Sequence, residues 1–200
     1  MSIQKSSLWK GFAVAVFLGV LGFAVLVIIL HFLRPEMNPI RIAISDYAIG
    51  PYGFLMTLAF LLRGLGVASL VAGIASSTGI LRSRAGLVLL SLITVGSFLV
   101  AIFPADRQNL TALVIHSLSA LLNFICLGIA ALVWSRRFRT DPGHRDRART
   151  SLILGWLMLL STVGFWAVLG SWSGLVERIL EVFIISWLWF MAWQLYTIEA

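Results

Sequence analysis

The stretch GFAVAVFLGVLGFAVLVIILHFL, residues 11–33, decides the fold, because its 23 residues include no Asp, Glu, Lys or Arg. A helix needs about 20 apolar residues to cross a hydrocarbon core about 30 Å thick. The apolar core of a cleavable signal peptide has only about 7–15 residues, and no small-residue cleavage motif follows Leu33. The stretch therefore predicts a transmembrane helix that the protein retains.

Five further apolar runs follow in a chain of 200 residues that is 60% hydrophobic and only 12% charged. A water-soluble protein of this length would need polar groups over most of its helix faces. The runs lack the period-two alternation of membrane β-strands. The sequence predicts an all-α membrane protein, with residues 1–200 forming one bundle of six transmembrane helices. The predicted spans are 11–33, 52–78, 85–103, 110–134, 151–169 and 175–196.

Lysine and arginine outside these spans fall mainly in every second loop, where ten of them lie. The intervening loops hold only Arg34, Arg41 and Arg107. Because basic loops stay in the cytoplasm, this bias predicts a protein of the cell membrane with both termini cytoplasmic. The ten residues are Lys5, Lys10, Arg82, Arg84, Arg136, Arg137, Arg139, Arg145, Arg147 and Arg149.

The net charge of +7 is a property of these loops and predicts membrane lipids, rather than nucleic acid, as the partner. The loop 135–150 carries six arginines, but Asp141 and Asp146 lie among them. This mixture favours anchoring on anionic lipid over binding to duplex phosphates. The single cysteine, Cys126, lies inside an apolar run and forms no disulfide within the chain.

Small residues four apart predict where the helices approach closely. Gly11, Ala15 and Gly19 form one such ladder, and another begins at Gly64 in the second span. Packing within one bundle explains these ladders more simply than a dimer does. A homo-oligomer is compatible with them but is not indicated.

Ionisable side chains inside hydrocarbon cost about 2.5–3.5 kcal/mol each, and those of this chain lie towards the predicted outer side. The helical rise places His116 roughly 9 Å, and Arg63 roughly 16 Å, from the outer ends of their spans. We predict one outward-facing polar pocket. Its candidate catalytic residues are Asp106 and His116, and its candidate ligand-binding residues are Asp46, Tyr47, Arg63, Glu177, Arg178 and Glu181.

Each candidate also has a structural interpretation. His116 would be hydrogen-bonded to a neighbouring helix, Glu177 would cap the last span, and Asp106 would be a turn residue. Arg63 would form a buried ion pair that fixes helix packing, or would bind an anionic headgroup. Its candidate partners are Glu181, Glu177 and Asp106.

Motifs for specific chemistry are scarce. The chain has no HExxH, P-loop, CxxC or nucleophile elbow, and only three histidines. We therefore predict no metal and no cofactor. A metal held by Asp46, Asp106, His116 and Glu177 is the weaker alternative, supported by ligand type alone.

Several landmarks occur in order along the chain: SDYAIGPYGFLM at residues 45–56, FPAD at 103–106 followed by His116, and GLVER at 174–178. Together they resemble the DUF998 family of small multi-pass membrane proteins over nearly the whole chain. The resemblance implies a membrane fold but no mechanism, because the family has no established activity. It points to Tyr47, Asp106, His116 and Arg178. Arg63 departs from the family pattern, in which an apolar residue usually stands there.

Three functions fit these features. The leading interpretation is a structural or regulatory membrane subunit whose polar residues lock the helices together. The alternative is a protein that binds or modifies a lipid headgroup at the outer leaflet, with Arg178 contacting phosphate and His116 transferring a proton or binding the ligand. A small-solute transporter comes third, because the cytoplasmic half has little polar lining. Whether the chain is an enzyme stays open.

Overall fold

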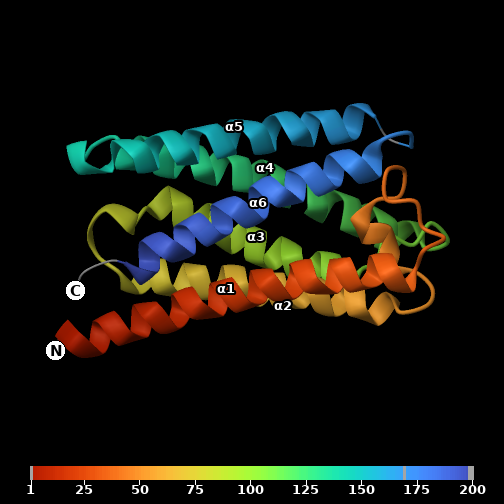
Figure 1. The fold of residues 1–200 in the computed structure, drawn as a ribbon, viewed down its shortest axis with the longest axis horizontal. Helices are drawn as coiled ribbons and strands as arrows, with labels where there is room; N and C mark the ends of the chain where they lie inside the picture. The colour runs from red at the N-terminus through yellow and green to blue at the C-terminus, as the bar shows by residue number, and fades with distance from the viewer. Residues whose placement is uncertain (1, 169, 198–200) are drawn as a thin grey trace.

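The computed structural model describes residues 2–168 and 170–197. These residues form six long α-helices and three short 3-10 helices (Figure 1). The all-α prediction is therefore confirmed. The long helices are α1 (Ser2–Leu33), α2 (Gly53–Ser76), α3 (Arg84–Ile102), α4 (Leu110–Phe138), α5 (Arg145–Ala167) and α6 (Ser173–Tyr196). The short ones are η1 (Ile44–Ala48), η2 (Gly79–Leu81) and η3 (Pro142–His144).

Successive long helices pack side by side, and α6 returns across the bundle to contact α1 and α2 as well as α5. Figure 1 shows α1 and α2 along one side, α5 and α4 along the other, and α6 running obliquely between them. Helix α1 begins and α6 ends at the same end of the bundle (Figure 1). We call this the proximal end and the opposite one the distal end.

Five of the helices, α1 to α5, are long and apolar enough to cross a membrane. Their outward faces carry large apolar side chains, including Leu18, Phe32, Leu118 and Leu160, all at least 62% exposed. Such a continuous apolar surface would be unfavourable in water. The architecture is that of a membrane protein.

Helices α1, α4 and α5 extend at least four residues beyond the proximal ends of their predicted spans, and α1 begins at Ser2, before the predicted start at 11. Helix α4 continues to Phe138, past the predicted end at 134, and α5 begins at Arg145, before the predicted start at 151. Hydropathy marks the hydrocarbon region, whereas polar helical turns can project from it. Ser83 and Asn109 cap α3 and α4, because each side chain accepts a backbone N–H three residues later. Residue 169, where the fifth predicted span ends, lies outside the described residues.

Close helix approach depends on a few glycines. A Cβ on Gly19 of α1 would lie 2.5 Å from the carbonyl oxygen of Leu62 and 3.0 Å from the Cα of Gly66, both in α2. Since these are backbone atoms, only glycine fits there. Gly11, in the same predicted ladder, has no neighbour within 4 Å of such a Cβ. Of the residues in this predicted ladder, Gly19 therefore permits close packing against α2, whereas Gly11 does not lie at a close helix contact.

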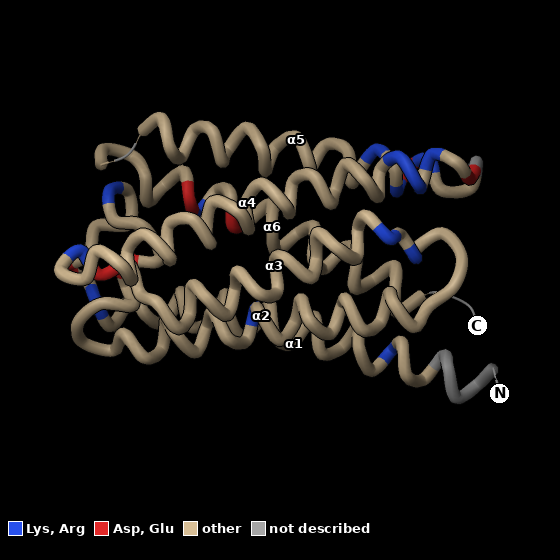
Figure 2. The backbone as a smooth tube through the Cα atoms, turned by 180° about the vertical axis from the view of Figure 1, so that it is seen from behind, with Lys and Arg blue, Asp and Glu red and all other residues tan. Residues whose placement is uncertain are grey.

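Charged residues gather at the two ends of the bundle. Figure 2 shows lysine and arginine concentrated at the proximal end, whereas acidic and basic residues mix at the distal end. Between the ends, the core is packed with apolar side chains such as Trp134, Trp187 and Met158. The polar groups that remain inside lie mostly in the distal half, where the candidate site is found.

Candidate functional site

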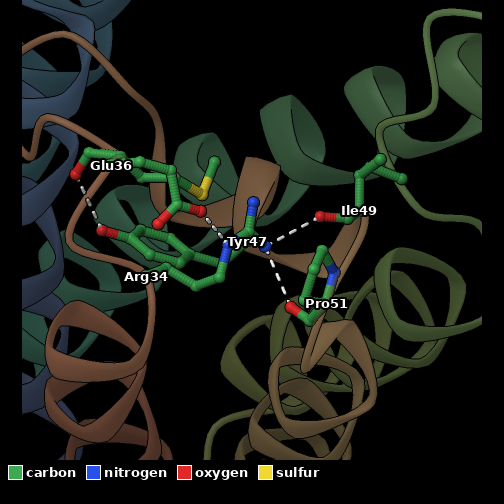
Figure 3. A network of polar contacts seen from close by, with 6 residues as sticks. Arg34, Glu36, Tyr47, Ile49 and Pro51 are labelled. Atoms are coloured by element: carbon green, nitrogen blue, oxygen red, sulfur yellow. Dashed lines mark hydrogen bonds and ion pairs between the residues drawn. The ribbon is translucent and has the colours of Figure 1, made fainter.

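The loop between α1 and α2 covers part of the distal end and is fastened by Arg34 (Figure 3). The Arg34 Nη1 donates to the carbonyl oxygens of Ile49, at 3.0 Å, and Pro51, at 2.9 Å. Its Nε is paired with Glu36, and this pairing holds the pKa of the Glu36 carboxyl below its usual range. The loop is thereby fixed just before α2 begins.

A cavity of about 610 Å³ lies between this loop and helices α4, α5 and α6. We call it the distal cavity. Its volume falls within the range of about 300–1,000 Å³ that is typical of small-molecule sites. Residues far apart in the sequence form its walls. Its charged and titratable lining residues are Arg41, Asp46, Arg107, His116 and Glu177.

One face of α4 carries the cavity deep into the bundle. Leu113, His116, Ala120 and Phe124 all line it, at the spacing of successive helical turns. From Leu113 to Phe124 this face is roughly 16 Å long at the rise of an α-helix. Phe165 of α5 lies opposite, edge-on to Phe124 with ring centroids 6.2 Å apart. The inner part of the cavity is therefore apolar.

The mouth of the distal cavity carries two free cations. Arg41 and Arg107 are exposed, and neither guanidinium has a hydrogen bond or ion pair within residues 2–168 and 170–197. Arg107 acts electrostatically on Asp46. Burial nevertheless raises the pKa of the Asp46 carboxyl, because it outweighs the opposite effect of Arg107. Because neither guanidinium forms an ion pair, both cations are available to a negative ligand.

Glu177 fastens η1 to α6 at the same cavity. The backbone N–H of Ile44 donates to the Glu177 Oε2 at 2.5 Å, and the Glu177 side chain is buried. A carboxylate that accepts a backbone N–H is stabilised in place. Glu177 thus shapes the wall between the loop and α6, which departs from the prediction of a simple helix cap.

His116 has a defined tautomer. It is only 3% exposed, and its Nδ1 lies 2.8 Å from the carbonyl oxygen of Phe103. Since a carbonyl oxygen can only accept, Nδ1 carries a hydrogen. The neutral ring then has a lone pair on Nε2, which is buried and has no partner among the described residues. His116 therefore combines a structural bond with an unused acceptor.

Arg178 forms a separate cluster with the loop. Its Nε donates to the Nε2 of His31 at 2.9 Å, and its Nη1 donates to the carbonyl oxygens of Ile42, at 2.9 Å, and Gly174, at 2.8 Å. Its guanidinium lies 5.9 Å from the ring centroid of Tyr47. Arg178 and Tyr47 do not line the distal cavity. Their contacts hold the loop against α6.

Arg63 forms the buried ion pair predicted for it, and its partner is Glu181. The Nη1 of Arg63 lies 2.5 Å from the Oε1 of Glu181, and both side chains are at most 6% exposed. The guanidinium carbon also lies 4.8 Å from the ring centroid of Phe23 and 5.5 Å from that of Phe60. The pair joins α2 to α6 away from the cavity wall.

Asp106 adopts the turn role that was its alternative interpretation. Its Oδ1 accepts the backbone N–H of Gln108 at 2.8 Å, and the residue does not line the distal cavity. The metal alternative required Asp106 beside the other acids and His116. Within the described residues, no three His, Cys, Asp or Glu side chains lie close enough to hold a metal ion.

The predicted single pocket is therefore divided. Asp46, His116 and Glu177 meet at the distal cavity, whereas the other candidates form the separate contacts described above. The sequence does not predict Arg41 and Arg107 as site residues, because each is only a charge in a loop. The available signal is that Arg41 lies five residues before Asp46 and that Arg107 lies just before α4. The sequence gives no sign of the contact between His31 and Arg178, because the two residues are 147 positions apart.

Comparison with known proteins gives one match, to a family. No curated protein and no solved structure matches the chain significantly. A family model described as "Protein of unknown function (DUF998)" matches residues 17–194, which include all the landmarks noted in the sequence. The chain belongs to the DUF998 family.

Proposed function

We propose that the chain crosses the cell membrane six times, with both termini in the cytoplasm and the distal end at the outer surface. The positive-inside bias supports this orientation, because the proximal end carries the basic loops. The return of α6 to the end where α1 begins agrees with an even number of spans. In this orientation α6 is the sixth span, and the distal cavity opens towards the outer leaflet.

The function that the geometry supports best is binding of an outer-leaflet amphiphile with an anionic or zwitterionic headgroup. One observation carries this proposal: the distal cavity joins a mouth with two free arginines to an apolar wall that ends at Phe124. Arg41 and Arg107 would attract a phosphate, and the inner wall would accept an acyl chain. The ligand would thus place its polar headgroup at the membrane surface and its acyl chain towards the membrane interior.

His116 adds a further requirement on the headgroup. Its unpartnered Nε2 would accept a hydrogen from a hydroxyl or ammonium group. A headgroup that offers such a donor, as ethanolamine does, should therefore bind better than choline. Asp106, the second candidate for acid–base work, lies off the cavity wall. We therefore propose binding, in a structural or regulatory membrane subunit, rather than turnover.

Filling the cavity tests this function. Ala120→Trp places a large ring on the cavity wall, whereas Leu118→Trp changes a lipid-facing residue that is 63% exposed. Native mass spectrometry of the purified proteins with phosphatidylethanolamine should show binding at least about 10-fold weaker for Ala120→Trp. Leu118→Trp should bind like the unmodified chain. Equal binding by both variants would rule out the distal cavity as the site.

A further inference from the structure

A second cavity lies at the proximal end, where α4 meets α5. It has a volume of about 290 Å³ and is lined by Arg139, Arg145, Ala148, Arg149 and Leu152. Arg139 directly follows the last residue of α4, whereas the other four residues share one face of α5. Three arginines, from the end of α4 and the start of α5, therefore line one small hollow.

The arginines of this cavity have no ion-pair partner among the residues that the structure describes. Within the same residues, their side chains form no hydrogen bond either. The nearby acid Asp141 is engaged elsewhere, because its Oδ2 lies 2.8 Å from the Nδ1 of His144 and its Oδ1 accepts the backbone N–H of Gly143. Like charges brought together without a counter-ion favour an external anion.

An apolar stripe continues from the cavity along α5. Leu152 on the cavity wall is followed, at four-residue intervals, by Trp156 and Leu160, which are 53% and 63% exposed. Helix α5 is also the least covered of the five apolar helices, with 22% of its apolar stretch buried. A ligand held at the arginines could therefore lay apolar chains along α5.

We propose that this proximal cavity binds the phosphate of an acidic phospholipid, with Arg139, Arg145 and Arg149 around the phosphate and the acyl chains along Trp156 and Leu160. Arginine suits this task, because its planar donors match phosphate oxygens in pairs. Ala148, which is buried, and Leu152 form an apolar floor that leaves the arginines as the polar contacts. The site is separate from the distal cavity and belongs to the opposite membrane surface.

The test compares two triple variants with the same loss of charge. Arg139→Gln, Arg145→Gln and Arg149→Gln remove the cavity arginines. The matched control, Arg82→Gln, Arg136→Gln and Arg147→Gln, removes three arginines outside that cavity. Binding of phosphatidylglycerol to the full chain in detergent is measured by native mass spectrometry. Phosphatidylcholine with the same acyl chains and glycerol phosphate serve as comparison ligands.

We expect the cavity variant to lose about 100-fold in phosphatidylglycerol affinity, since it loses direct charge-assisted hydrogen bonds to the phosphate. The control should lose less than about 10-fold, because its arginines do not line the cavity and salt screens their attraction. Phosphatidylcholine, which has no net charge, should bind weakly to every protein. Because the distal cavity also accepts an anionic headgroup, both triple variants are measured in the Ala120→Trp background, so that binding at the two sites is distinguishable. Equal losses in the two triple variants would show diffuse attraction and overturn the site. Glycerol phosphate that binds as tightly as the lipid would overturn the role of the apolar stripe.

Discussion

The charged side chains of Arg63 and Glu181 are both buried, and each depends on the other to offset the free-energy cost of its burial. Removing one member of a buried ion pair strands the other charge and typically costs about 3–5 kcal/mol. Arg63→Leu should therefore lower the free energy of unfolding of the protein in detergent by an amount in that range, which thermal melting would show. Arg63→Leu combined with Glu181→Leu should recover much of the loss. Unchanged melting of Arg63→Leu alone would mean that the pair does not stabilise the bundle.

His116 has two nitrogen atoms with separable tasks. Asparagine can keep the hydrogen bond to the Phe103 carbonyl that Nδ1 now makes, but it has nothing at the position of Nε2. His116→Asn should therefore melt like the unmodified protein and lose its preference for phosphatidylethanolamine over phosphatidylcholine. His116→Ala should lose that preference and also about 1–3 kcal/mol of stability, because it strands a buried carbonyl group. A preference that survives in His116→Asn would assign His116 a structural role alone.

At the scale of the helices, packing of α1 against α2 depends on Gly19. Gly19→Ala should destabilise the bundle by about 1–3 kcal/mol, because its Cβ would press on α2 backbone atoms that cannot rotate away. Gly11→Ala is the matched control in the same helix, where a Cβ meets nothing. It should be neutral or slightly stabilising, since alanine is the better helix former. Melting curves of the two variants in one detergent would check this, and equal losses would contradict the packing.

The helices themselves could be predicted from the sequence, whereas their lateral arrangement could not. The hydropathy of each span is enough to predict that span, and the rise per residue then gives the depth of a side chain in the membrane. Depth placed His116, Glu177 and Arg178 near one level. Depth does not tell where around the bundle axis a side chain lies. It therefore could not distinguish residues on the wall of the distal cavity from those in the Arg178 cluster. The loop contacts of Arg178 depend on how residues near Ile42 fold over α6, which local patterns do not encode.

At the scale of the whole molecule, the orientation in the membrane can be tested by cysteine labelling. Cysteines introduced at Arg82 and Thr140, both exposed near the proximal end, should be shielded from an impermeant thiol reagent in intact cells. One at Asn38, exposed in the α1–α2 loop, should be labelled. Native Cys126 is buried and should not interfere. Permeabilised cells provide the control, since all three introduced positions should then react. Labelling of Thr140→Cys from outside would reverse the orientation.

Photo-crosslinking in intact membranes tests most directly whether the distal cavity holds an amphiphile. Benzoylphenylalanine at Phe124 would report on the apolar end of the cavity, and the same residue at Ile125, which is 37% exposed, would report on bulk lipid. After illumination, mass spectrometry should find one defined amphiphile attached at position 124 and the general lipid mixture at position 125. The absence of an adduct at position 124, or the same mixture at both positions, would contradict a ligand-binding cavity.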